Sequence, residues 1–539
     1  MKNYTTLFLG VMFVLLIGLL VPGQPSWAKP VESVLGNQSG DSQTTPQLIE
    51  AARQAGEIDQ ETADLYLAYA LSGNQNLPEQ YRSYQPWDGT LPILHLRRAM
   101  KTMQPGATRA TVQAVLAGAC DTESSGSLPN SMLTTNFYIE YGSLGAVLTI
   151  NDFVDALEGS WAKEVDDSGW AAPPAYTPNP PPGGRYHVRI DSLLWGEYGY
   201  TSPVGAHAGL VGDNPNTLWD DQDAYASCIV LDDNFSFSLN PEAALVSTVA
   251  HEFNHAIQFG YGALEGSYVP DDALVEGMAT WMEDEVFDDS NDNYYFLWPN
   301  FAMCMGQYTS DPYAYWITFR GLTEQFGAGV AGGSEQVMQD FWELVSQDAG
   351  DGLAVLNTAL SNRGSNLADA FHVYAVAVKF NKACGGGYVY PHCLEEGPGY
   401  VAEAGATNLT GSIASVGGSY SKSIPDNYAI NWVGLPANAG WYNVRLRNTS
   451  TTGGMLRGSV VCDAGNTLEV YALPSLVGPS GSSTLNYFNS TGCNSVVAVL
   501  TNQSQTADNP GSCTARNYQL SLTSASALDQ TRLPVLFKP

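Results

Sequence analysis

Hydrophobic and polar positions alternate with different periods in different parts of the chain. At 59–73 and 91–103 apolar residues recur every three or four positions, which predicts two amphipathic helices in an N-terminal block at 29–131. Residues 132–400 mix short alternating runs with longer helical stretches. From 401 to 525 the helical period disappears, and short alternating runs are separated by Gly, Asn, Pro and Ser, which is typical of a β-sandwich.

The region 132–400 is expected to form an α+β domain with a mixed sheet. Strands are predicted at 137–141, 186–190 and 226–231. The run Asn240-Pro241-Glu242 provides a cap, a first-turn proline and an acid, so a helix is expected from there to about Gly260. Further helices are predicted at 151–161, 272–287, 313–326, 334–345 and 367–380. Strands followed by helices predict the α+β class.

The first 28 residues are typical of a signal peptide. Lys2 precedes an apolar run at 7–21, and a small-residue step ends at Ala28. An uncleaved anchor is the alternative, although the run is shorter than the roughly 20 residues that span a bilayer. We therefore expect a secreted protein, extracellular or attached to the cell surface, with no membrane span after cleavage. The block at 29–131 is then either a pro-segment or an ordinary helical domain, and 526–539 is a short tail.

Composition and cysteine use narrow the class of protein. The chain has 54 acidic and 22 basic residues, a net charge of −32, which disfavours nucleic acid as a partner. Eight cysteines without a CxxC spacing argue for disulfides rather than a thiolate zinc site, in keeping with export. Among the many pairings that eight cysteines allow, we predict only Cys384 with Cys393, which flank three glycines.

The predicted helix after Asn240 carries the strongest chemical signal, His251-Glu252-Phe253-Asn254-His255. Histidines at i and i+4 lie on one helix face, so both rings can reach one zinc ion, with Glu252 beside the open position. The strand predicted at 226–231 would supply the sheet edge that holds an extended peptide. A catalytic zinc needs a third protein ligand, and Glu276 on the following helix can supply it.

This two-part signature resembles that of the gluzincin metallopeptidases, the thermolysin-like and aminopeptidase-N-like enzymes. In the aminopeptidase-N branch the liganding glutamate lies in an Asn-Glu-Gly-Phe-Ala type segment, which is similar to Val275-Glu276-Gly277-Met278-Ala279 here. The resemblance implies a zincin-type catalytic domain, a protein or peptide substrate, and Glu252 as general base for a zinc-activated water. Val275 replaces the usual polar residue and no amine-binding motif occurs, so an endopeptidase is favoured over an aminopeptidase.

The resemblance also implies a donor for the oxyanion. Tyr313, at the start of a predicted helix, is similar to the tyrosine of the aminopeptidase-N branch, with Tyr315 in reserve. Thr280 and Glu283 are candidates to support a ligand histidine. Each of these four residues could instead be an ordinary packing or surface residue.

Other features are weaker. The acidic runs at 220–223 and 288–293 could bind Ca²⁺, although acidic turns are usually only solvated. Four histidines without a neighbouring ligand are expected to be structural: His187, His207, His372 and His392. A second function remains open, a surface-binding protein whose sandwich recognises glycan or protein and whose zinc site is structural or inactive. The sequence decides neither the cleavage specificity nor the oligomeric state.

Overall fold

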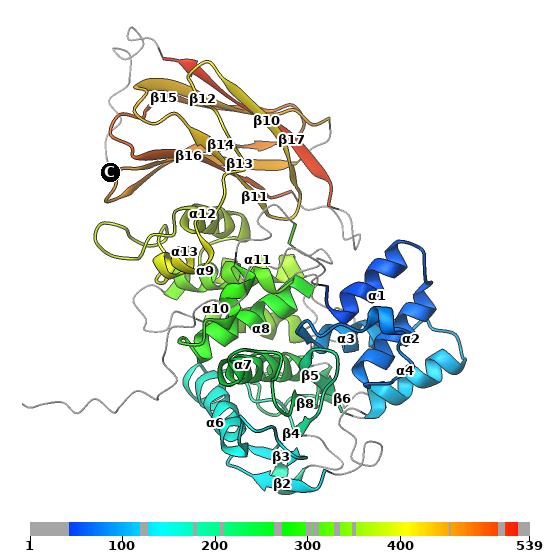
Figure 1. The fold of residues 1–539 in the computed structure, drawn as a ribbon. Coiled ribbons are helices and arrows are strands. Elements are labelled where there is room, and N and C mark those ends of the chain that lie inside the picture. Colours follow the sequence, from blue (N-terminus) through cyan, green and yellow to red (C-terminus); the bar gives the residue numbers. More distant parts are fainter. Residues whose placement is uncertain are drawn as a thin grey trace, which may run out of the picture.

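The computed structural model gives an α+β fold with a C-terminal part made of strands, as predicted (Figure 1). The predicted signal peptide at 1–28, the tail at 526–539 and part of the boundary near 120 lie outside the described residues. The structure describes residues 43–118, 128–175, 181–204, 210–221, 223–262, 272–297, 304–305, 312–327, 335–347, 352–451, 454–504 and 513–525.

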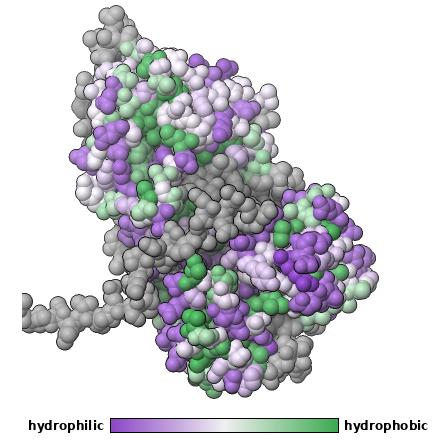
Figure 2. All heavy atoms as spheres, viewed as in Figure 1, coloured by the Kyte–Doolittle hydropathy of each residue, from purple (hydrophilic) through white to green (hydrophobic). Residues whose placement is uncertain are grey.

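The N-terminal block is helical, but it also contributes to the central sheet. Its helices are α1 (Thr45–Gln54), α2 (Gln60–Leu71), α3 (Thr90–Met100) and α4 (Ala107–Gly118), with a short turn, η1 (Glu79–Tyr81), and a two-residue strand, β1 (Trp87–Asp88). Ile49 and Leu96 of the block share a core with Val230 of the central sheet. The visible outer face of the block is mostly hydrophilic (Figure 2). The block is therefore packed onto the central domain along its apolar side.

The central sheet has six strands in the order β1-β5-β8-β4-β3-β2. They are β2 (Asn130–Leu133), β3 (Phe137–Tyr141), β4 (Tyr186–Asp191), β5 (Glu197–Pro203), β8 (Ser227–Asp232) and β1. Strand β8 is antiparallel to β5 and parallel to β4, so it lies inside the sheet. The expectation that the strand at 226–231 forms the sheet edge is therefore wrong, because β5, which the sequence pattern missed, separates it from β1. A small hairpin, β6 (Leu210–Gly212) with β7 (Ala224–Tyr225), lies apart.

Helices cover the sheet and position the candidate site. Helix α7 (Pro241–Gly260) begins after Asn240, whose side chain accepts a hydrogen bond from the Ala243 amide, as the cap pattern predicted. Helix α7 is followed by α8 (Asp272–Val286), and both are buried over most of their length. The remaining central elements are α6 (Ile150–Trp161), η2 (Ala162–Asp167), η3 (Pro182–Gly184), η4 (Asp292–Phe296), η5 (Tyr313–Tyr315), α9 (Trp316–Gly327), α10 (Gln336–Ser346), α11 (Gly352–Asn362), α12 (Leu367–Phe380) and α13 (Gly397–Ala404).

The C-terminal part consists of two sheets that share one core. One sheet contains β10 (Ser419–Pro425), β17 (Ala515–Ser524), β12 (Trp441–Asn448) and β15 (Ser482–Asn489). The other contains β14 (Leu468–Val477), β13 (Met455–Asp463), β16 (Ser495–Asn502), β11 (Ala429–Leu435) and β9 (Gly411–Ser412). Val444 and Leu520 of the first sheet pack with Val460 of the second. This is the face-to-face arrangement expected of a sandwich.

The second face of the five-stranded sheet packs on the central domain. The Trp432 indole N–H donates to the carbonyl of Ala375 on α12 at 3.0 Å. His372, on the same helix, lies between the hydroxyls of Ser459 and Thr501. Strands β11 and β16 are buried on both faces for this reason.

Three disulfides join described cysteines. The predicted bond between Cys384 and Cys393 is confirmed, and the others are Cys462–Cys493 and Cys304–Cys513. The last of these links the region before η5 to the sandwich. Such bonds are typical of proteins that fold in an oxidising compartment. None of the described helices has both the length and the apolar character that crossing a membrane requires.

Candidate metal centre

Two histidines on α7 and one glutamate on α8 converge in the buried centre of the protein. His251 and His255 are one helical turn apart, and their Nε2 atoms lie 3.0 Å from each other. Glu276 Oε2 lies 3.0 Å from Nε2 of His251 and 3.4 Å from Nε2 of His255. Ligands at 2.0–2.1 Å in a tetrahedral zinc site are separated by about 3.3 Å. The three predicted ligands therefore have a spacing that suits one small metal ion.

The charge of this cluster also favours a cation. Asp88, His251, His255 and Glu276 each offer a ligand atom, and these atoms lie within 4.8 Å of one another. All four residues are at most 2% exposed, and Glu252 is completely buried beside them. Glu276 Oε1 and Asp88 Oδ2 are buried and have no hydrogen-bond partner among the described residues. Buried carboxylate oxygens without partners are costly, and a bound divalent cation would satisfy them.

Each ligand histidine is held through its other ring nitrogen. Nδ1–H of His251 donates to Glu283 Oε1 at 2.8 Å, and Nδ1–H of His255 donates to Gln258 Oε1 at 2.9 Å. With Nδ1 protonated, each ring directs the lone pair of Nε2 at the cluster. The supporting contact of Glu283 agrees with the sequence analysis, whereas the hydroxyl of Thr280 makes no hydrogen bond with a described residue. Gln258 was missed, although its position three residues after His255 on the helix was a usable signal.

The carboxylate of Glu252 is fixed by two threonines from different parts of the chain. Its Oε2 accepts hydrogen bonds from Thr201 on β5 at 2.7 Å and from Thr90 of the N-terminal block at 3.0 Å. Its Oε1 is buried without a hydrogen-bond partner among the described residues. Burial raises the pKa of the Glu252 carboxyl, and the adjacent carboxyl of Asp88 raises it further.

Two other carboxyls in the group have displaced pKa values. Burial opposes ionisation of Glu276, but the neighbouring His255 and His251 outweigh it and lower the pKa of Glu276 to about 2. Burial raises the pKa of Glu283 to about 7, although its hydrogen bond with His251 works in the opposite direction. Glu276 is therefore a carboxylate anion across the whole neutral range, the form that can bind a cation.

Of the two tyrosines considered as oxyanion donors, Tyr313 lies beside the cluster. Its ring centroid is 5.9 Å from that of His251, and it stacks on Phe296. The hydroxyl of Tyr315 instead donates to the carbonyl of Cys304 at 2.6 Å. A Cβ atom on Gly277 would come within 2.9 Å of Tyr315 Cβ, so Tyr315 is packed against the backbone of α8. A further tyrosine, Tyr198 on β5, also lies among these carboxylates, which together with burial raise the pKa of its hydroxyl.

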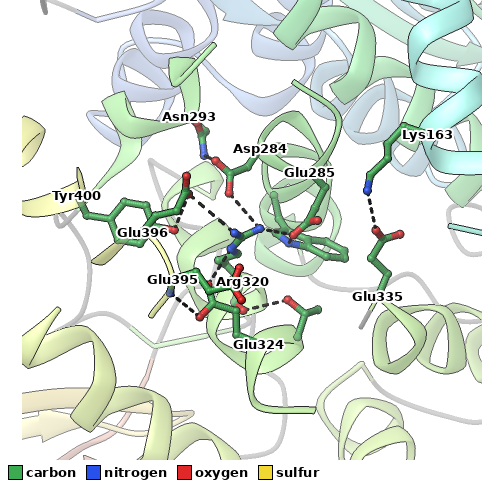
Figure 3. A network of polar contacts seen from close by, with 12 residues as sticks. Lys163, Asp284, Glu285, Asn293, Arg320, Glu324, Glu335, Glu395, Glu396 and Tyr400 are labelled. Carbon is green, nitrogen blue, oxygen red and sulfur yellow. Dashed lines mark hydrogen bonds and ion pairs between the residues drawn. The ribbon is translucent and has the colours of Figure 1, made fainter. Parts of the chain in front are cut away.

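The far side of α8 is fixed by a buried arginine. Arg320 on α9 forms ion pairs with Glu285 and Asp284 of α8 and with Glu324 and Glu396 (Figure 3). Arg320 is 6% exposed, so this charge network is largely shielded from water. The network ties α8, which carries Glu276, to α9 and to the segment that precedes α13.

The weaker sequence candidates form no comparable cluster. Among the described residues, no other set of three His, Cys, Asp or Glu ligands comes together, and the runs at 220–223 and 288–293 supply none. Gln222 and His207 lie outside the described residues. His187 pairs with Glu140 at 3.0 Å, and His372 forms hydrogen bonds with two hydroxyls, contacts that suit structural histidines.

Comparison with known proteins gives no independent assignment. No family model matches the chain, and no curated protein matches it. The geometry of the metal cluster is therefore the main evidence for what the protein does.

Proposed function

We propose that the protein is a secreted zinc-dependent peptidase, and that it cleaves internal peptide bonds. The observation that supports this most directly is the convergence of His251 Nε2, His255 Nε2 and Glu276 Oε2 at 3.0–3.4 Å, with Glu252 buried next to His251 on the same helix. Two imidazoles and one carboxylate are the ligand set of gluzincin catalytic zinc. A purely structural zinc has no use for an adjacent carboxylate that is not a ligand.

The residues around the cluster suit hydrolysis. When bound, a zinc ion would polarise the scissile carbonyl and lower the pKa of a bound water to near 7. Glu252 would take a proton from that water and pass it to the departing amine. Tyr313, whose ring lies beside His251, would donate a hydrogen bond to the carbonyl oxygen as negative charge develops there. Glu283 and Gln258 hold the two imidazoles in the tautomer that ligation needs.

Secretion is part of the same proposal. The signal-like segment at 1–28 and the three described disulfides both favour an oxidising compartment. The sandwich at 401–525 would then be an accessory domain, held to the central domain by α12 and by the Cys304–Cys513 bond.

The test is metal content together with hydrolysis of casein by the purified protein, with and without a chelator. We expect one zinc per chain, and chelator-sensitive cleavage that is weak while the block at 29–131 is attached and rises when limited proteolysis removes it. His255→Ala and Glu276→Ala should lose both, whereas His392→Ala, a half-buried histidine outside the cluster, should keep both. Failure of the wild-type protein to bind zinc would refute the proposal. Zinc bound at Glu276→Ala with unchanged affinity would remove this glutamate from the ligand set.

A further inference from the structure

The metal cluster contains a residue that does not belong to the domain of the other ligands. Asp88 is the last residue of β1 in the N-terminal block, and it is 2% exposed. One of its carboxylate oxygens lies within 4.8 Å of the ligand atoms of His251, His255 and Glu276. Its Oδ1 accepts the amide N–H of Thr90 at 2.7 Å, whereas Oδ2 is buried without a hydrogen-bond partner among the described residues. Asp88 therefore offers a fourth ligand oxygen at a site where a catalytic zinc would need only three protein ligands.

We propose that the N-terminal block keeps the peptidase latent, with Asp88 as a fourth metal ligand in the position that the catalytic water would occupy. This inference rests on the proposed zinc peptidase and adds its regulation. A catalytic zinc keeps one position open for water, and a carboxylate that fills this position prevents the water from being activated. Displacement of Asp88 by water would restore the open position without any change in the other three ligands.

The same turn of the block also engages the general base. Thr90, two residues after Asp88, donates its hydroxyl hydrogen to Glu252 Oε2 at 3.0 Å, and its Oγ1 accepts the amide N–H of Thr201 at 2.9 Å. Glu252 therefore accepts a hydrogen bond from the block through Oε2, and its carboxyl also interacts with that of Asp88. While the block is in place, no water can occupy the metal's fourth position and lose its proton to Glu252.

The block also covers the strand that a substrate would use. Strand β1 pairs in parallel with β5, and Trp87 and Gly89 donate their amide N–H groups to the carbonyls of Gly196 and Gly199 at 3.0 and 2.9 Å. An extended peptide binds a zinc peptidase by adding to such a strand edge. At Gly89 the approach is close, because a Cβ atom there would lie 2.6 Å from Glu197 Oε1. The segment around Asp88 thus occupies the edge of β5 that an extended peptide would use.

Side-chain contacts on both sides of this segment hold the block in position. Arg98 and His95 of α3 both lie 3.2 Å from the carboxylate of Asp272, the first residue of α8. Arg97 donates to the carbonyl of Pro203 at the end of β5. The block is therefore attached to β5 and to α8, two of the elements around the metal cluster. Activation would require these contacts to be broken, which proteolytic removal of the block can achieve.

The test compares full-length protein with the variants Asp88→Asn and Asp88→Ala, each loaded with Co²⁺ in place of zinc. The visible absorption of Co²⁺ depends on its ligands, so loss of a carboxylate should change the spectrum in both variants. Release of zinc to a chelator should become at least about tenfold faster. Casein cleavage should rise. The control is Asp64→Asn, which alters another buried acid of the block, hydrogen-bonded to Gln60 and not part of the metal cluster.

The possible outcomes separate this inference from the proposed function. If the wild type binds metal but the Co²⁺ spectrum and the zinc release rate of both Asp88 variants match those of the wild type, Asp88 is not a ligand and the inference is wrong. If the spectrum changes and cleavage rises, the inference is supported. If the spectrum changes but Asp88→Ala cleaves casein no faster than the wild type, Asp88 is a permanent ligand and latency is refuted. If no form of the protein binds metal, the proposed function itself fails. Should Asp88→Ala fail to fold, Asp88→Asn, which keeps the acceptor for the Thr90 amide, decides.

Discussion

Replacement of Glu252 by glutamine tests the role of this residue with little structural disturbance. The amide has nearly the shape of the carboxylate, and its oxygen can accept the same hydrogen bonds from Thr90 and Thr201 that Oε2 accepts now. The ligand atoms of His251, His255 and Glu276 are untouched. Glu252 is fully buried beside the carboxyl of Asp88, so a neutral side chain removes a like-charge contact and should not destabilise the fold.

The expected loss is confined to catalysis. A positioned general base contributes a factor of roughly 10² to 10⁴ to the rate. This factor corresponds to about 2.7–5.5 kcal/mol of activation free energy, because each tenfold change is about 1.36 kcal/mol. Glutamine cannot accept the proton from water, so we expect kcat to fall by this factor. The zinc content should stay at that of the parent protein.

The assay is zinc analysis and turnover of a quenched peptide by Glu252→Gln. Turnover is measured in the Asp88→Ala background, so that a latent parent protein does not conceal the effect. Glu164→Gln is the matched control, because Glu164 is equally buried and accepts a hydrogen bond from Asn254 on the same helix. Turnover within about threefold of the parent would be too small a change for a lost general base and would refute the assigned role.

Three further predictions concern other parts of the structure. Tyr313→Phe should lower kcat by about 10² to 10³ with little change in KM. Tyr315→Phe should leave kcat unchanged, because the Tyr315 hydroxyl donates to a backbone carbonyl. Steady-state kinetics on both variants decides which tyrosine acts. Arg320→Met leaves buried carboxylates without their cation and should lower the free energy of unfolding by about 3–5 kcal/mol, measured by denaturant titration; a loss below about 1 kcal/mol would contradict this. Burial lowers the pKa of His372 to about 3, so His372 stabilises the fold fully above about pH 6.5 and progressively less as the pH falls toward 3. Between pH 6 and pH 4 the free energy of unfolding should therefore fall by up to about 1.4 kcal/mol per pH unit more in the wild type than in His372→Gln. Denaturant titration at both pH values measures this difference, and equal losses would refute the effect.

Local sequence patterns predicted the helices around the site well. The cap at Asn240 and the apolar spacing after it placed α7, and α8 and α12 were predicted within a residue or two. These helices are long, and local capping and periodicity largely determine where they begin and end. Strand β5 was missed because its sequence, Glu-Tyr-Gly-Tyr-Thr-Ser-Pro, contains glycine and proline and lacks clear alternation. It is a strand because it is paired with β8 and β1.

The convergence of His251, His255 and Glu276 was predictable for the same local reason. Histidines four residues apart must share a helix face, and a glutamate on the next helix can reach them through a short connection. Glu283 was predicted as a partner of a ligand histidine, and its contact with His251 is part of the site. Whether Tyr313 or Tyr315 faces the cluster depends on how η5 packs against α8, which no local pattern states.

The sequence by itself determined the metal-binding signature, the α+β class and the strand-rich C-terminal part, because all three depend on spacing within one element or on regular punctuation between elements. Only the tertiary structure brought Asp88 into the metal cluster and Thr90 into contact with Glu252, from which it is 162 residues distant in the chain. Contacts of this kind arise from strand pairing and from a core shared between domains. They produce no periodic pattern in the sequence. The residues that we infer to control the site could therefore be identified only in the folded structure.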